Sequence, residues 1–272
     1  MQNLNTQPIQ KSDLGSYSFT DFENSESELE RLQAQGTLFW EQEKELLETH
    51  RISEQARILD LACGPGFVTR KIKSIAPGSE VTGVDLNAEL LRIAKEKNND
   101  QIEYIHANCQ SLPFGDNSFD FVYSRFLFQH LGDPRKALRE CRRILRPGGK
   151  LLILDVDDRD VAVSPVSEEF NFFTRQSAQY QARNGGNRFV GRDLDFLLRA
   201  TGYQDIHSSL HRLSSRGVGL DSFFWLTTHF KLEQFPAHLS RHFQERLPQI
   251  RDELRRNAST IFVGIHVVEA TA

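Results

Sequence analysis

The stretch RILDLACGPGFVT, from Arg57 to Thr69, decides the fold of this chain. Its apolar run ILDL predicts a strand, and the glycines at 64 and 66 predict a tight turn directly after it. The apolar residues that follow are spaced as on one face of a helix: Phe67, Val68, Ile72 and Ile75. A strand, a glycine turn and a helix bring backbone amides and a helix N-terminus up to a ligand, so this pattern is typical of nucleotide sites.

Strands and helices alternate around and after this stretch, which predicts an α/β fold. The predicted strands cover 57–62, 80–84, 102–106, 119–124 and 150–156, and the helices between them cover 65–76, 87–97 and 133–146. Asn87 and Asp133 are the expected N-caps, and Pro134 suits the first helical position. Such alternation gives an open parallel sheet that binds ligands beyond the carboxyl ends of its strands.

The rest of the chain is less regular. Residues 1 to about 15 are polar, and we expect them to be disordered or loosely attached. The acidic stretch from Phe19 to about His50 predicts one or two amphipathic helices whose acidic face lies in solvent. Further helices are predicted at 162–184, 191–203 and 220–257, and further strands at 204–213 and 259–270.

The composition is that of an ordinary globular protein. The 272 residues suffice for one large α/β domain with an appended cap, and the net charge of −4 gives no general attraction for nucleic acid or anionic membranes. Cys63, Cys109 and Cys141 lie far apart, which argues against disulfides and structural zinc and favours a reducing cytoplasm. The histidines lack ligand spacing, so we expect no metal site, and we find no signal peptide or membrane span.

The glycine turn is compatible with three kinds of nucleotide site. A dinucleotide-binding motif requires a third small residue at the position of Thr69. A phosphate-binding P-loop requires a lysine, which is absent from the corresponding position. A nucleoside without phosphates needs a carboxylate for its ribose hydroxyls. Asp85, at the end of the second strand and 21 residues after Gly64, supplies one. Dinucleotide folds use a similar acid, so Asp85 alone does not decide between these kinds of site.

Five motifs in order resemble those of class I S-adenosylmethionine-dependent methyltransferases. DLACGPG resembles the D/E-x-G-x-G-x-G motif, and the likeness continues through VTGVDLN, HANCQSLPFGDNSFD, FVYSRFLFQHLGDP and LRPGGKLLILDV. The resemblance implies a Rossmann-like, doubly wound sheet of seven strands, mostly parallel, with 259–270 as an antiparallel last strand. Two residues depart from the motifs. Ala62 replaces a glycine, where we expect ordinary strand-end dihedrals, and Asn108 replaces an aspartate.

The resemblance also implies which residues hold the cofactor, S-adenosyl-L-methionine. Asp60 would face the methionine ammonium, cap the turn, or do both, and Asp85 with Leu86 would meet the ribose. Asn108 would accept from the adenine amine, while the Cys109 amide donates to the ring. The remaining cofactor residues would approach through backbone or reach the methionine end: Ala62, Gly64, Gly66, Ser124, Arg31 and Gln35.

Similar methyltransferases fold an N-terminal segment over the cofactor. Residues 1–50 are therefore expected to form a helical lid, and 51–272 the methyltransferase domain, with helical cap inserts at about 160–190 and 220–257. Tyr17 would cover the methyl group, and Phe173 would help wall an apolar substrate pocket. Arg125 would pair with a substrate anion, with the cofactor carboxylate, or in a surface salt bridge.

His130 is the candidate catalytic residue. It follows the fourth strand, where substrates of this family meet the methyl group, and it would act as a general base or a substrate contact. Packing near the following helix would be a purely structural role for this side chain.

The expected function is methylation of a small organic molecule at oxygen, nitrogen or carbon, as in quinone or secondary metabolism. An RNA or protein methyltransferase would want a basic groove, and the charge balance disfavours one. The same motifs would also serve a non-catalytic subunit that binds the cofactor, and a dehydrogenase is disfavoured by Thr69. We expect a cytoplasmic monomer or homodimer that has a small-molecule substrate and binds neither nucleic acid nor membrane.

Overall fold

The computed structural model describes residues 15–17, 19, 25–50, 52–97 and 101–272. Most of the expected disordered N-terminus, residues 1–14, and part of the predicted lid therefore lie outside the described residues.

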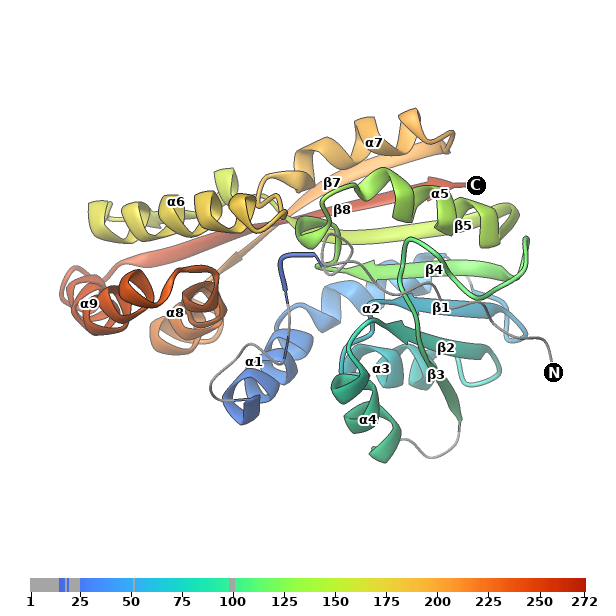
Figure 1. The fold of residues 1–272 in the computed structure, drawn as a ribbon, viewed down its shortest axis with the longest axis horizontal. Helices are drawn as coiled ribbons and strands as arrows, with labels where there is room; N and C mark the ends of the chain where they lie inside the picture. The colour runs from blue at the N-terminus through green and yellow to red at the C-terminus, as the bar shows by residue number, and fades with distance from the viewer. Residues whose placement is uncertain (1–14, 18, 20–24, 51, 98–100) are drawn as a thin grey trace.

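One mixed sheet forms the centre of the molecule (Figure 1). Its strands run in the order β3-β2-β1-β4-β5-β8-β6, with β7 also paired to β8. The strands from β1 to β5 pair in parallel, and β8 runs antiparallel to its three neighbours. The strands are β1 (Arg57–Leu61), β2 (Glu80–Asp85), β3 (Ile102–His106), β4 (Phe119–Arg125), β5 (Leu145–Val156), β6 (Ala162–Ser164), β7 (Gln204–Ser214) and β8 (Thr260–Thr271).

The predicted doubly wound α/β sheet with an antiparallel last strand is confirmed, but the strand count of seven is wrong. The described residues form an eight-stranded sheet. The extra strand is β6, which was expected to begin a helix over 162–184. It pairs with the first residues of β8, while β5 pairs with the last ones on the same side. Three residues are too few to carry a recognisable period, so the sequence pattern did not distinguish this strand from a helix.

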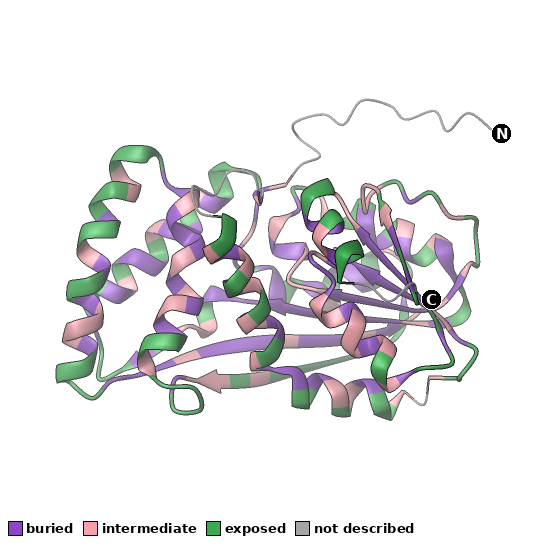
Figure 2. Ribbon diagram, turned by 90° about the horizontal axis from the view of Figure 1, so that it is seen from below, coloured by how far each residue is buried: buried purple, intermediate pink, exposed green. Residues whose placement is uncertain are grey.

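Helices cover both faces of the sheet. On one face lie α2 (Trp40–Thr49), α3 (Phe67–Ile75) and α4 (Ala88–Glu96), and on the other α5 (Pro134–Ile144) and α7 (Leu194–Ala200). Two separate clusters of buried apolar side chains fill the space between helices and strands. Figure 2 shows the buried residues along the strands and the exposed ones along the outer sides of the helices.

The helix ends follow the sequence signals. The Asn87 side chain accepts a hydrogen bond from Leu90 N at 2.9 Å, and the Asp133 side chain accepts one from Arg135 N at 3.1 Å. Both residues are N-caps, and Pro134 opens α5. These three predictions are confirmed.

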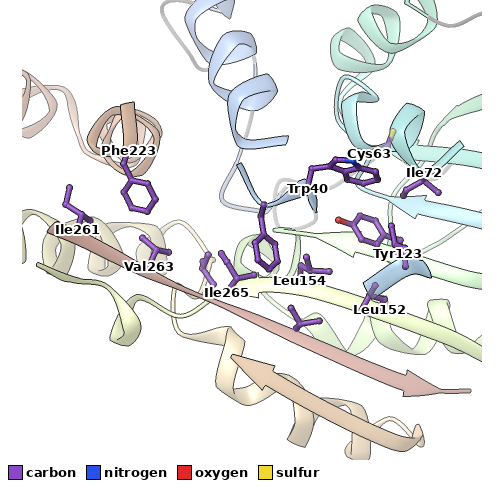
Figure 3. Close-up of a cluster of buried hydrophobic side chains, with 14 of the residues drawn as sticks. Trp40, Cys63, Ile72, Tyr123, Leu152, Leu154, Phe223, Ile261, Val263 and Ile265 are labelled. Carbon is purple, nitrogen blue, oxygen red and sulfur yellow. The ribbon is translucent and has the colours of Figure 1, made fainter. Parts of the chain in front are cut away.

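The cap elements gather around the far end of β8. They are α6 (Glu168–Arg183), α8 (Leu220–Thr228), the 3₁₀ segment His229–Gln234 and α9 (Ala237–Arg256), with α1 (Ser25–Leu38) nearby (Figure 1). Phe223 of α8 points toward Ile261 and Val263 of β8 in the same apolar cluster that holds Trp40 and Tyr123 (Figure 3). The cap is thus joined to the sheet by one continuous core.

The acidic face of the N-terminal helices is not wholly in solvent, contrary to expectation. Glu28 of α1 and Glu43 of α2 are fully buried, and each is paired with an arginine. Arg31, the partner of Glu28, lies three positions away on α1, whereas Arg125, the partner of Glu43, lies 82 residues away and was not revealed by sequence periodicity. In the described part of the chain, no helix has the length and apolarity needed to cross a bilayer.

Candidate active site

A cavity of about 330 Å³ opens beyond the carboxyl ends of β1, β2 and β4, where the strand order reverses. One part of its wall comes from these strand ends and from the loop after β3, and includes Asp60, Gly64, Asp85 and Asn108. Another part is largely apolar and comes from α1, β8 and the cap, with Leu32, Phe170, Phe223, Leu226, Phe230 and Ile265. The reversal point of an open α/β sheet is where such folds bind ligands.

The glycine turn has left-handed backbone at three positions. The φ angles are +64° at Ala62, +53° at Gly64 and +71° at Gly66. The expectation of ordinary dihedrals at Ala62 is therefore wrong: its Cβ sits in a conformation that costs about 1–2 kcal/mol for an L-residue. Gly64 lines the cavity, and a Cβ added there would meet no atom within 4 Å.

Gly66 is required for packing between α3 and β3, not for access to the cavity. It does not line the cavity, and a Cβ at this position would lie 2.4 Å from the Tyr104 hydroxyl. This glycine allows α3 to pack against β3, whereas Gly64 leaves the backbone open to a ligand.

Asp85 ties the turn to the end of β2. Its Oδ2 accepts a hydrogen bond from Gly64 N and its Oδ1 accepts one from Asn87 N, both at 2.8 Å. Burial raises the pKa of Asp85, although backbone N–H groups oppose the shift. Each carboxylate oxygen keeps a further lone pair for a ligand. Leu86 lines the cavity beside it.

Asn108 and Cys109 also line the cavity. The Asn108 amide oxygen accepts from Gln110 N at 2.8 Å and thereby shapes its own loop. An amide oxygen has two lone pairs, so this bond leaves one acceptor position for a ligand amine.

Asp60 is 2% exposed, and its Oδ2 accepts a hydrogen bond from the Thr69 hydroxyl at 2.6 Å. Burial raises the pKa of Asp60 to about 7, against the effect of that bond. From the sequence, Thr69 was noted only because it does not match the motif of dinucleotide sites. Its hydroxyl in fact holds a carboxylate at the cavity wall.

Arg31 brings a buried guanidinium to the cavity from α1. It forms two 2.7 Å bonds to Glu28, and the Tyr17 hydroxyl donates to the same carboxylate at 2.7 Å. Arg31 Nη1 is buried and has no hydrogen-bond partner among the described residues. Tyr17 also lines the cavity.

Arg125 forms a buried ion pair, so the surface salt bridge considered for it is wrong. Its Nε donates to Glu43 at 2.7 Å, and the Tyr123 hydroxyl donates to the other oxygen of Glu43 at 3.0 Å. Its Nη2 donates to the Gln35 carbonyl at 2.7 Å. Arg125 and Gln35 both line the cavity, so this network joins α1 and α2 to β4 at the wall.

His130 lines the cavity and is partly buried against Tyr17, with ring centroids 5.4 Å apart. Its Nδ1 lies 2.9 Å from Ser16 Oγ and 3.4 Å from Gln181 Nε2. The amide nitrogen of Gln181 can only donate, so Nδ1 accepts and the proton of the neutral ring lies on Nε2. Burial, with Arg188 and Arg31 nearby, lowers the pKa of His130 to about 3. A neutral ring of this kind donates from Nε2 and is a poor base at neutral pH.

Three predicted site residues lie outside the cavity wall: Phe173, Ser124 and, as described above, Gly66. Phe173 is fully buried in the cap, where it packs on Phe235 and Phe243, and Phe170 of the same helix lines the cavity instead. The assignment of Phe173 to the pocket wall is therefore wrong: Phe173 lies three positions after Phe170 on α6, and its ring contacts Phe235 and Phe243 instead of the cavity. Ser124 is fully buried and also lies outside the wall.

Several wall residues were not foreseen from the sequence. Phe126, which follows β4, has a φ of +55° and lines the cavity. Arg188 and Lys231 come from the cap and are also part of the wall. Lys231 carried only a weak signal, as a charged residue between Phe230 and Leu232, because Glu233 follows it two positions later. Arg188 follows a glycine turn and has no such signal.

Residues 59–153 match the family model described as a methyltransferase domain. The chain is 43% identical over 100 residues to a demethylmenaquinone methyltransferase of Thermotoga maritima, covering 37% of this chain and 43% of that protein. It is 41% identical over 106 residues to the ubiquinone/menaquinone biosynthesis C-methyltransferase UbiE of Hahella chejuensis, again covering 37% and 43%. The chain thus spans less than half the length of these curated relatives.

Solved structures share the fold at low sequence identity. A phosphoethanolamine N-methyltransferase of Haemonchus contortus, in complex with S-adenosyl-L-methionine, has a TM-score of 0.60 at 21% identity, over 97% of this chain and 60% of that one. The [4+2]-cyclase SpnF has a TM-score of 0.53 at 20% identity, over 80% and 75%. Fold, motifs and family match agree: residues 59–153 of this chain form a methyltransferase domain, and their motifs are similar to those of the class I S-adenosylmethionine-dependent superfamily.

Proposed function

We propose that this chain is an S-adenosylmethionine-dependent methyltransferase that acts on a small organic molecule at oxygen, nitrogen or carbon. The observation that carries the proposal is a single cavity with two kinds of wall. One wall lies at the strand ends and holds Asp60, Gly64 and Asp85, as a nucleoside site requires, and the other is the largely apolar wall of the cap. The first part suits the cofactor and the second suits an organic acceptor.

The residues present fit the cofactor. Gly64 leaves its backbone open to the cavity, Asp85 retains acceptor positions for ribose hydroxyls, and Asp60 offers a carboxylate for an ammonium. The Arg31 guanidinium has a free donor for a carboxylate. Asn108, Cys109, Ala62, Leu86 and Gln35 would complete the wall.

S-adenosylmethionine supplies, when bound, a methyl group on a positively charged sulfur. The protein's own contribution is to hold the acceptor in line and to exclude water, which is worth roughly 7–11 kcal/mol in well-oriented reactions. The neutral His130 ring would orient the acceptor by donating from Nε2 rather than remove its proton. Tyr17, held by Glu28, would close the cavity over the reacting atoms, with α1 as the described part of the lid.

The names of the relatives do not identify the molecule that this chain methylates. Two of them are named for menaquinone or ubiquinone methylation, but the match to them covers only 37% of this chain. The cap segments that supply part of the apolar wall, among them α6 and α8, lie outside the matched domain at 59–153. A quinone-like ring is therefore one candidate among apolar small molecules. The apolar wall also disfavours RNA, which needs a basic groove.

Thermal shift tests the cofactor. We expect S-adenosylmethionine and S-adenosylhomocysteine to raise the Tm, and NADH to leave it unchanged. Stabilisation by NADH alone would overturn the proposal. The variant Asp85→Ala should abolish the shift while Asp116→Ala, at an exposed loop position, should retain it. Transfer of a labelled methyl group to members of a panel of phenols, amines and acidic carbons would then identify the acceptor.

A further inference from the structure

Two buried cations of the cap share one carboxylate beside the cavity. Arg188 Nη2 lies 2.5 Å from Asp158 Oδ1, and Lys231 Nζ lies 3.2 Å from Asp158 Oδ2. The exposed fractions are 5% for Arg188, 3% for Lys231 and 8% for Asp158. Both cations line the cavity, whereas Asp158 stands behind them. The group therefore presents one excess positive charge to the cavity.

A third cation lies in the same region. Arg31 and Arg188 both approach the Phe230 ring, with guanidinium carbons 4.8 and 5.3 Å from its centroid. Arg31 is already neutralised by Glu28. Three cations thus face two carboxylates around one ring, and the difference remains one positive charge.

The two guanidinium groups also have unused donors. Arg188 Nε is buried without a hydrogen-bond partner among the described residues, as is Arg31 Nη1, the donor proposed above for the cofactor carboxylate. The side-chain oxygen of Gln129 accepts from Arg188 Nη1, which leaves Nε as the free donor. Buried unpaired donors and an unbalanced buried charge are both costly, so such a site favours an anionic ligand.

The buried carboxyl group of Asp155 lies nearby but forms no ion pair with Arg188 or Lys231. Asp155 accepts hydrogen bonds from Val156 N at 2.8 Å and Gln129 N at 3.2 Å, and it does not line the cavity. His130, which does line it, is neutral. Among the described residues, the carboxylates in ion-pair contact with these three cations are those of Glu28 and Asp158, while Asp60 and Asp85 belong to the strand-edge part of the wall. A ligand in the cavity can supply the further negative charge.

We propose that Arg188 and Lys231 form an oxyanion subsite for the acceptor, which is an apolar molecule carrying one acidic group such as a carboxylate. The apolar body would lie against Phe170, Phe223 and Leu226, which line the same cavity. This assignment rests on the proposed function for the claim that the bound acid is the methyl acceptor. The subsite itself can be tested without methyl transfer.

The test compares acids with their neutral amides. Calorimetry would measure binding of benzoate, 1-naphthoate and octanoate, each against its amide, to the full chain with and without S-adenosylhomocysteine. We expect at least one acid to bind about 10–100-fold more tightly than its amide, the range for hydrogen bonds to charged groups. If no acid in the panel exceeds its amide, the subsite does not exist.

The variant Lys231→Met removes the excess charge but keeps the length of the side chain. It should abolish the preference for acid over amide, while Asp158 remains paired with Arg188 and the Tm stays at or above that of the wild type. Lys136→Met, at an exposed position on α5, should keep the preference. A Lys231→Met protein that still prefers the acid overturns the proposal. An equal loss of S-adenosylhomocysteine affinity in this variant would also overturn it, because the pair would then serve the cofactor.

Failure of the proposed function gives a different result. A chain that prefers acids but binds no S-adenosylhomocysteine would keep the subsite and lose the methyltransferase assignment. A chain that binds S-adenosylhomocysteine but shows no preference for acids would keep the assignment and lose the subsite.

Discussion

Ala62 holds a strained backbone at the tip of β1, with a φ of +64°. Ala62→Gly should relieve about 1–2 kcal/mol of strain in the folded state. Glycine also increases the conformational entropy of the unfolded chain, which lowers the free energy of unfolding by about 0.4–1 kcal/mol. We therefore expect a net stabilisation of about 0.5–1 kcal/mol in urea denaturation. Ala182→Gly, on an exposed helical position of α6, should instead lose about 0.5–1 kcal/mol. Equal losses in both variants would contradict the strain at Ala62.

Asp60 should make cofactor affinity depend on pH. Burial raises its pKa to about 7, so below that pH the carboxyl is largely protonated and neutral. Pairing with an ammonium requires the charged form and lowers the pKa. Affinity for S-adenosylhomocysteine should therefore rise with pH from about 5.5 to about 7, by at most about tenfold per unit, and then level off. The ligand's own amino group stays protonated over this range.

Asp60→Asn provides the control for this dependence. The amide keeps the shape and can still bond to Thr69, but it does not titrate. Calorimetry at each pH should show weaker binding that is nearly independent of pH. Asp155 also has a pKa raised by burial to about 7, but it does not line the cavity. A slope that persists in Asp60→Asn would assign the titration to a group other than Asp60.

The turn between β1 and α3 contains two glycines with separable roles. Gly64→Ala adds a Cβ in open space, so its stability cost is limited to about 1–2 kcal/mol of backbone strain, while S-adenosylhomocysteine affinity should be lost. Gly66→Ala adds the same strain and also drives a Cβ to 2.4 Å from the Tyr104 hydroxyl, so it should destabilise the fold further. Denaturation and calorimetry on both variants check this order. A Gly64→Ala protein with unchanged affinity would contradict a close backbone approach.

The strands and helices between residues 57 and 156 were predicted well from the sequence, because the signals that define them are local. Strand, turn and helix in the stretch 57–75 each have a period or a glycine, and Asn87 and Asp133 cap their helices through residues two or three positions away. The cap and the charged wall had no such signals. Glu43 meets Arg125, and Lys231 meets Asp158, across 82 and 73 residues. Burial of a charge depends on a partner that only the tertiary fold supplies.

The molecule as a whole encloses its cavity between three parts of the chain that are distant in sequence. The strand edge, α1 and the cap each contribute wall residues, and α1 is held to α3 through the bond from Lys71 Nζ to the Gly36 carbonyl at 2.9 Å. A ligand that spans these parts must leave before α1 can open. Ligand at 100 times its Kd stabilises the closed state by about 2.7 kcal/mol, which corresponds to roughly 100-fold slower opening-dependent exchange.

Hydrogen exchange with S-adenosylhomocysteine should therefore slow in α1 and in the β1–α3 turn together. The helix α9 supplies no cavity residue, so its exchange should change little unless it proceeds through global unfolding. Glu43→Gln should reduce the protection of α1 by leaving the buried Arg125 without its carboxylate, since Arg125 also donates to the Gln35 carbonyl of that helix. Protection confined to the turn would mean that α1 packs on the cavity without covering the cofactor. Protection of both would support α1 as part of the lid.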